Sequence, residues 1–163
     1  MRSGGQARRI EEGSDLLTVL RAAGYLTDTS VQLLGRFVAR WGVPPLDAML
    51  ESHVMSEDRL ADAIAEAFKC ERIYALDHEE INQELLQRVP FRIAFELELL
   101  VLGIGDDNDS MRIMMVDPSS ASRWQGLRAY VTGPIKVCVC ERKLVRRAAQ
   151  DLYPIEAQLP GLV

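Results

Sequence analysis

Apolar residues recur at three- and four-residue spacing through the first half of the chain, which is the pattern of amphipathic helices. Thr27 and Ser56 each precede such a run and are followed by acidic residues, so both are predicted N-caps. Gly24 can take a positive φ and is predicted to end the first helix. The pattern therefore predicts four helices, over residues 10–23, 28–41, 45–53 and 57–69.

These four helices are predicted to form an internal repeat. Residues 15–38 align with residues 44–67, an offset of 29 positions. The alignment pairs Gly24 with His53 and the cap Thr27 with Ser56. One helical hairpin cannot bury its own apolar face, so we expect the two units to stack on each other or on another element.

The second half has shorter apolar runs bounded by turn-forming residues, which are typical of strands. Strands are predicted at 99–104, 111–116 and 135–140, with a short extended piece at 71–74. Helices are predicted at 82–88, at 91–97, from Ser119 or Ser120 to 132, and at 142–153. This order predicts an α+β fold, in which a four-helix repeat lobe is followed by a small β-β-α-β-α lobe.

The same reading divides the chain into four parts. Residues 1–9 are predicted to be a flexible tail, residues 10–70 the helical repeat lobe, and residues 71–153 the α+β lobe. The last part, residues 154–163, contains Pro160 and Gly161 and is expected to be irregular.

Composition narrows the function classes. The 163 residues carry 24 acidic and 19 basic side chains, a net charge of −5, so a nucleic-acid partner is not expected. An odd count of three cysteines fits a reducing compartment, and the longest apolar stretch, 99–104, is far short of the ~20 residues that cross a membrane. We therefore expect a cytoplasmic protein without direct membrane insertion.

Several motifs together resemble a known family. They are Leu16 to Asp28, the run Met55-Ser-Glu-Asp-Arg-Leu, the segment from Asn82 to Pro90, and a strand that ends in Asp117-Pro118. In this order they resemble the N-terminal domain of type II secretion and type IV pilus assembly ATPases, the GspE N-terminal or MshEN type. The resemblance spans roughly residues 14–153. It implies a docking or regulatory module for a protein partner of a secretion, pilus or motility machine.

A subset of this family binds cyclic di-GMP through a tandem motif of roughly Arg-Leu-Gly, a leucine pair, Gly and a closing Gln. Here Asp15 and Pro44 stand at the two Arg positions, and Val38 and Ala67 at the two Gln positions. An aspartate facing a dianionic ligand is electrostatically unfavourable. We therefore expect the scaffold without a bound cofactor, with cyclic di-GMP binding as the alternative. The remnant groove would contain Leu16, Leu20, Gly24, Met49 and His53.

No pattern of catalytic residues is evident, and a small enzyme is the second alternative. The sequence has no Gly-x-x-x-x-Gly-Lys-Ser/Thr loop and therefore no phosphate cradle of an ATPase motor. Cys138 and Cys140 are predicted to be small apolar residues of a buried strand rather than metal ligands. Glu96 and Glu98 are interpreted as ordinary surface charge.

Basic residues near the end of the chain are a candidate partner surface. The last predicted helix carries a basic stripe, and two arginines of the preceding helix are expected to lie beside it. Such a cluster can bind an acidic partner, whereas the simpler interpretation is a solvated helix face. The candidate residues are Arg123, Arg128, Arg142, Lys143, Arg146 and Arg147.

Overall fold

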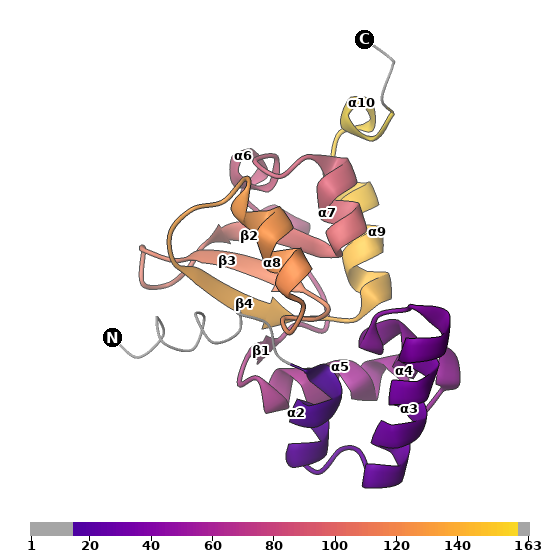
Figure 1. The fold of residues 1–163 in the computed structure, drawn as a ribbon. Helices are drawn as coiled ribbons and strands as arrows, with labels where there is room; N and C mark the ends of the chain where they lie inside the picture. The colour runs from indigo at the N-terminus through magenta and orange to yellow at the C-terminus, as the bar shows by residue number, and fades with distance from the viewer. Residues whose placement is uncertain (1–14, 160–163) are drawn as a thin grey trace.

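The first half of the chain folds into four helices. The computed structural model describes residues 15–159, so the predicted tail 1–9 and the predicted helix start at residue 10 lie outside the described residues. Figure 1 shows the four helices grouped at one end of the molecule, below the sheet. They are α2 (Leu16–Ala22), α3 (Asp28–Trp41), α4 (Pro45–Ser52) and α5 (Glu57–Ala67).

The predicted repeat is present in the helix ends. The Thr27 hydroxyl accepts a hydrogen bond from the Ser30 amide at 3.1 Å, and the Ser56 hydroxyl accepts one from the Arg59 amide at 3.2 Å. Both bonds satisfy amides that a helix N-terminus leaves without a backbone partner. The α2–α3 and α4–α5 hairpins therefore begin their second helices in the same way.

The second half contains strands and shorter helices. A linker follows β1 and carries η1, a single 3-10 turn, before α6. The elements are β1 (Glu71–Arg72), η1 (His78–Glu80), α6 (Gln83–Leu86), α7 (Phe91–Leu97), β2 (Leu99–Ile104), β3 (Met111–Met115), α8 (Ala121–Arg128), β4 (Ile135–Val139), α9 (Arg142–Leu152) and α10 (Ile155–Gln158). The helical part followed by a small mixed lobe confirms the predicted α+β fold class.

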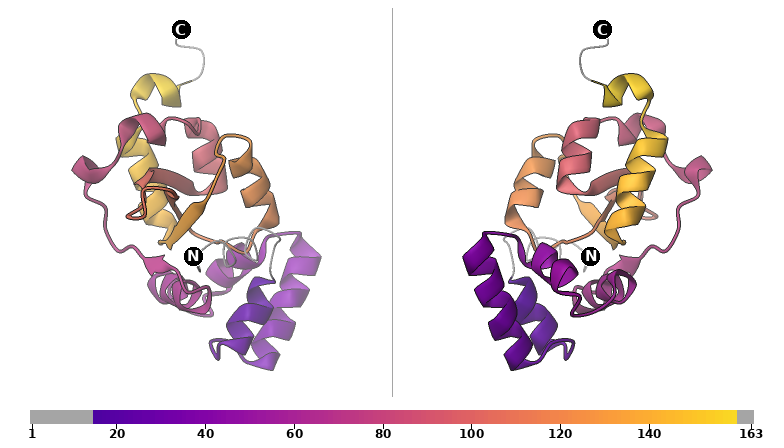
Figure 2. Two further views of the ribbon diagram at one scale, coloured as in Figure 1. Left: turned by 90° about the vertical axis from the view of Figure 1, so that its left-hand side faces the viewer. Right: turned by 90° about the vertical axis from the view of Figure 1, so that its right-hand side faces the viewer.

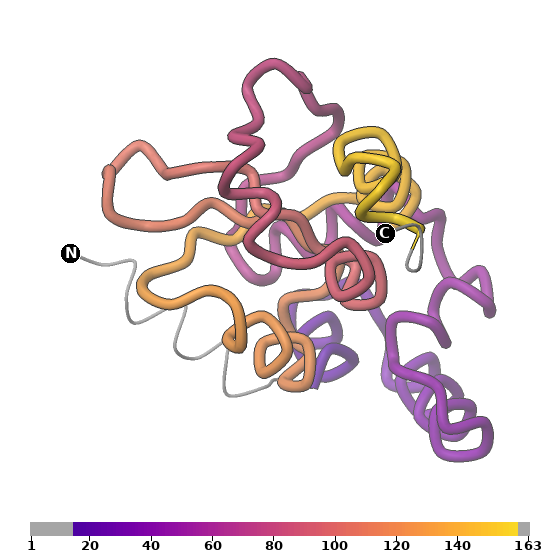
Figure 3. Tube along the Cα trace, turned by 90° about the horizontal axis from the view of Figure 1, so that it is seen from above, coloured from indigo at the N-terminus to yellow at the C-terminus, as the bar shows by residue number. Residues whose placement is uncertain are grey.

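The four strands form one mixed sheet in the order β1-β4-β3-β2. Strand β4 pairs in parallel with both β1 and β3, and β2 pairs antiparallel to β3. Helix α7 packs between α8 and α9 beside the sheet, and α5 packs against β1 and β4 (Figures 1 and 2). Figure 3 shows the loop between β2 and β3 projecting from one side of the molecule.

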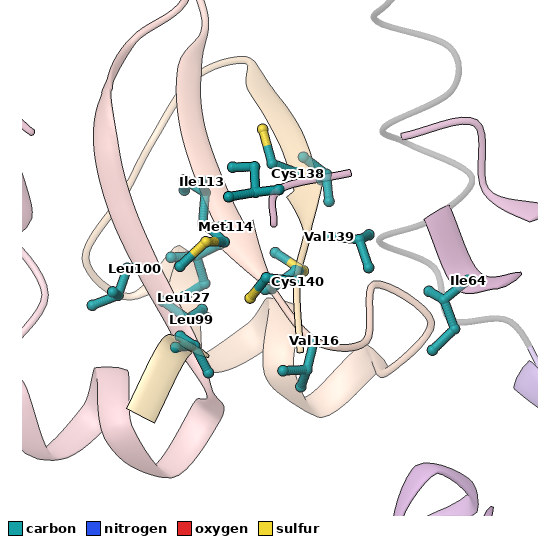
Figure 4. Packing of buried hydrophobic residues seen from close by; sticks show 14 of the residues in the cluster. Ile64, Leu99, Leu100, Ile113, Met114, Val116, Leu127, Cys138, Val139 and Cys140 are labelled. Carbon is teal, nitrogen blue, oxygen red and sulfur yellow. The ribbon is translucent and has the colours of Figure 1, made fainter. Parts of the chain in front are cut away.

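One continuous apolar core runs through both halves. It includes side chains from three strands, α5 and α8, part of which is shown in Figure 4. Ile64 of α5 and Val139 of β4 are both almost fully buried, so the repeat shares this core with the sheet. The buried Tyr153 hydroxyl donates to the carbonyl oxygens of Leu86 and Val89, at 2.9 and 2.6 Å, which fixes the end of α9. Within residues 15–159, no helix is long and apolar enough to cross a bilayer.

Three predictions about elements need correction. The segment after Pro154 is helical rather than irregular over Ile155–Gln158, and the Gln158 side chain ties it to the end of α9 by donating to the carbonyl oxygens of Gln150 and Tyr153. Helix α8 ends at Arg128 and not at 132. The extended piece at 71–74 contains β1, a member of the sheet that the predicted β-β-α-β-α order left out.

Candidate functional site

The five residues of the predicted groove fall into two groups. Leu16, Leu20 and Met49 are exposed by 1% or less and belong to the apolar core. Gly24 and His53 lie in the two equivalent turns, at φ of +87° and +53°, and are exposed. Packing accounts for the three buried side chains, so only the two turn residues reach the surface.

The six basic residues of the predicted partner surface do not form one exposed stripe. Arg123 and Arg142 point into a polar network between elements, and Arg128 donates to the Gly133 carbonyl oxygen at 2.6 Å. Three cations remain exposed on α9, each near a carboxylate of the same chain. They are Lys143, Arg146 and Arg147.

Glu98 is the centre of the polar network. Its side chain is only 8% exposed, so the interpretation of Glu98 as surface charge is wrong. It follows α7 with φ +54°, a left-handed conformation that is uncommon for a residue other than glycine. Both of its carboxylate oxygens accept hydrogen bonds from Arg142, and Arg123 and Arg146 lie at 3.5 and 3.7 Å. Three arginines thus neutralise one buried carboxylate.

Arg142 extends this network to the helical repeat. One of its terminal nitrogens donates to Asp47 of α4 at 2.6 Å as well as to Glu98 at 3.0 Å. Burial disfavours the charged guanidinium, but the hydrogen bonds that Arg142 donates to Glu98 and Asp47 outweigh this and raise its pKa. Arg142 is therefore a fixed cation between α4, the end of α7 and the start of α9.

Two more polar contacts join the helical repeat to the second half of the chain. Glu57 of α5 accepts a hydrogen bond from the Lys143 amide at 3.0 Å, in the first turn of α9. The side chain of Glu141, the α9 N-cap residue, makes no such bond, so the helical repeat caps α9 from outside. Arg72 of β1 pairs with Asp62 of α5 at 2.8 Å. We call the contacts of Asp47, Glu57, Arg72 and Arg142 the junction.

Helix α3 carries apolar side chains that stay exposed. Of its fourteen residues, only Leu34 is buried. Leu33 and Trp41 are 58% and 62% exposed, and Phe37 is half-buried between them in the sequence. Spacings of four residues place these three side chains along one face of the helix. We call Leu33, Phe37 and Trp41 the α3 stripe.

A separate cavity of about 360 Å³ lies between the linker after β1 and the β2–β3 end of the sheet. The ion pair of Arg112 with Glu71, at 2.8 Å, is in its wall, and the exposed side chains of Tyr74 and Ile104 are at its rim. The Tyr74 ring lies 4.2 Å from the Arg72 guanidinium. The wall is thus mostly polar, and Arg112 is neutralised by Glu71.

The three thiols have raised pKa values, as thiols in a protein core do, and not the lowered pKa values of reactive cysteines. Burial is the main cause that raises the pKa of Cys70 and Cys138 to about 11, and burial raises that of Cys140 further. Among residues 15–159, no three His, Cys, Asp or Glu side chains are placed to hold a metal ion. In the β2–β3 loop, Asp107 accepts hydrogen bonds from Asp109 and Ser110 of the loop itself.

The sequence did not identify Glu98, Asp47 and Glu57 as members of a polar network between distant segments. The sequence offered one signal for Glu98, a charged residue placed directly before a continuous apolar strand, where its surroundings are buried. Asp47 and Glu57 lie in first helical turns, where acidic residues are common for reasons of helix stability alone. Their second role, in the junction, depends on packing between distant segments.

Solved structures with the same fold include MshE and the N-terminal domain of XpsE. A structure of MshE with cdg matches with a TM-score of 0.66 and 17% identity, over 86% of this chain and 99% of that chain. Two crystal forms of the N-terminal domain of XpsE match with TM-scores of 0.62 and 0.56. Their identities are 20% and 17%, over 94% and 85% of this chain and 99% and 94% of theirs. No curated protein sequence matches the chain.

The model of the MshEN domain family matches residues 72–159, more than half of the chain. This segment contains the sheet, α6 to α10 and Glu98. Together with the structural matches, it confirms the resemblance to the N-terminal domains of type II secretion and type IV pilus assembly ATPases. The chain belongs to the MshEN domain family.

Proposed function

We propose that this chain is a non-catalytic docking or regulatory module, which works in the cytoplasm on a protein partner of a secretion, pilus or motility machine. Membership of the MshEN family supports a regulatory or interaction role. The junction supports it as well, because it holds the helical repeat and the sheet in a fixed arrangement that a partner can recognise.

The α3 stripe is the single observation that carries this proposal. Exposed aromatic and aliphatic side chains that line up on one helix face mark interaction sites more often than scattered ones do. Leu33 and Trp41 are both more than half exposed, whereas many other apolar side chains of the same lobe are buried in the core. The exposed cations of α9, Lys143, Arg146 and Arg147, are a second and weaker contact surface, since each already has a carboxylate nearby.

Cyclic di-GMP binding is the second candidate function, and the similarity to MshE with cdg favours it. The positions that would contact the nucleotide argue against it. Asp15 caps α2 through its own carboxylate, and Pro44 has no side-chain donor. Leu20 and Met49 are fully buried. We therefore rank this function below protein docking.

Co-purification from the native cell tests the docking function. The tagged full chain is compared with Leu33→Ser/Trp41→Ser and with Lys143→Gln/Arg147→Gln. We expect the wild type to recover a component of a secretion or pilus machine, identified by mass spectrometry, and the α3 variant to lose it while its melting temperature is unchanged. Recovery of the same component by the α3 variant would show that α3 does not carry the function.

Calorimetry tests the alternative. We expect no heat of binding when cyclic di-GMP is titrated into the full chain at millimolar concentration. A saturable signal that Gly24→Asp abolishes would reverse the ranking of the two functions.

A further inference from the structure

We propose that the α3 stripe binds an amphipathic helix of a protein partner, with apolar residues one turn apart and Asp or Glu residues along one flank. This inference rests on the proposed docking function and names the chemistry of the partner. Three observations carry it: the alignment of the apolar side chains, the fixed position of Trp41, and two arginines beside the stripe.

The stripe has the dimensions of a helix-packing ridge. Leu33, Phe37 and Trp41 follow each other at four-residue spacing, which is the ridge that packs against the grooves of another helix. Helix α3 packs against α2 and α4, and Leu34 is its one buried side chain. A partner helix can therefore lie on the stripe without displacing any helix of the repeat.

The aromatic end of the stripe is held in place before a partner binds. The Phe37 and Trp41 rings are 6.4 Å apart between centroids and tilted by 51°. The Arg40 guanidinium lies 5.2 Å from the centre of the Trp41 ring. A tryptophan that is 62% exposed but already contacts Phe37 and Arg40 loses less side-chain freedom on binding, which favours affinity.

The charge beside the stripe selects an acidic partner. With 3.6 residues per turn, Arg36 and Arg40 lie along the edge of the stripe that is farther from Leu34. Among residues 15–159, neither arginine has a carboxylate within 4.0 Å, whereas most other arginines of the repeat and junction do. Carboxylates on the partner would complete two ion pairs and fix the direction of its helix.

A second copy of the chain fits this surface less well. An antiparallel two-fold pairing of α3 with itself would place Arg36 and Arg40 of both copies on the same side, where they repel. A bilayer is also a poorer fit, because three apolar side chains and two cations form only a short footprint.

Binding of two designed peptides tests the partner class. Both are amphipathic helices with the same leucine stripe and a fluorescent label, one flanked by Glu and the other by Lys. They are titrated into the full chain and followed by anisotropy. We expect the acidic peptide to bind at least tenfold more tightly than the basic one. Trp41→Ala should weaken the binding of the acidic peptide at least tenfold. Arg36→Gln/Arg40→Gln should bind the acidic and the basic peptide with equal affinity.

Matched controls come from other exposed positions. Ile155 is 69% exposed on α10, so Ile155→Ala controls for the loss of an exposed apolar side chain. Arg88→Gln/Arg92→Gln controls for the loss of two exposed cations. Both controls should bind the acidic peptide as the wild type does.

Several results would overturn the inference. Equal affinity for both peptides, or equal weakening by the controls, would show that α3 does not select an acidic helix. Binding of anionic phosphatidylserine vesicles, or dimerisation measured by ultracentrifugation, that Trp41→Ala abolishes would assign the stripe to a membrane or to a second copy. If the native partner is still lost in Leu33→Ser/Trp41→Ser while both peptides bind equally, the docking function stands and only the partner class is refuted.

Discussion

The junction predicts a large loss of stability when Arg142 is replaced by Gln. This change removes the two hydrogen bonds to Glu98 and the one to Asp47, which is 2.6 Å from the guanidinium. Breaking a buried ion pair by removing one partner costs about 3–5 kcal/mol. Glu98 keeps Arg123 and Arg146 at 3.5 and 3.7 Å, so the loss should be at or just below the lower end of that range. We expect a loss of about 2–3 kcal/mol.

Urea unfolding followed by circular dichroism measures this loss. For a chain of this size, about 2–3 kcal/mol corresponds to a fall of roughly 5–10 °C in the melting temperature. The dependence of the unfolding free energy on urea should stay the same, because the surface exposed on unfolding does not change. Asp47→Asn should cost only about 1 kcal/mol, since it removes the charge of one acceptor of Arg142 and leaves the Glu98–Arg142 pair in place.

Arg92→Gln is the matched control. Arg92 pairs with Glu96 one turn away, and both side chains are more than half exposed. Pairs of this kind contribute about 0.3–0.5 kcal/mol. If Arg142→Gln loses no more stability than Arg92→Gln does, Glu98 does not depend on Arg142 and the account of the junction is wrong.

Four further predictions concern individual side chains. Tyr153→Phe should lose about 1–2 kcal/mol in urea unfolding, because two buried carbonyl oxygens lose their donor. Cys70 and Cys138 should react slowly with iodoacetamide at pH 8, and Cys140 only after unfolding, because burial raises the pKa of each thiol. The pKa of the Cys138 thiol is about 11 in the folded protein and about 9 in the unfolded chain. The free energy of unfolding contributed by this thiol should therefore be constant below pH 9 and should fall as the pH rises from 9 through 11. His53→Gly should stabilise the chain by about 0.5 kcal/mol in the same assay, because glycine takes the positive φ of 53° without strain; a loss would contradict this.

The features that could be predicted from the sequence are those that neighbouring residues determine. Thr27 and Ser56 cap their helices through amides three residues later, so a short window of sequence contains the whole interaction. The turn at Gly24 is local in the same sense. The repeat follows because both hairpins carry these signals in the same order.

Glu98 and α3 show why the rest could not be predicted. The burial of Glu98 depends on Arg142, 44 residues away, and no periodic pattern in the sequence joins the two. On α3, apolar residues occupy more than half of the circumference, so the pattern predicts a helix but not which side stays uncovered. Only the fold shows that Leu34 is buried, whereas Trp41, seven residues later on nearly the same side of α3, is exposed.

The cap that Glu57 provides for α9 makes the two halves of this chain interdependent. A fragment cut at Glu71 would carry α9 without an acceptor for the Lys143 amide, and Arg142 without Asp47. Helix α9 would then begin with a frayed turn, although every residue of that helix is present. Grafting the sheet lobe onto another protein would therefore require a substitute for two carboxylates from the discarded half.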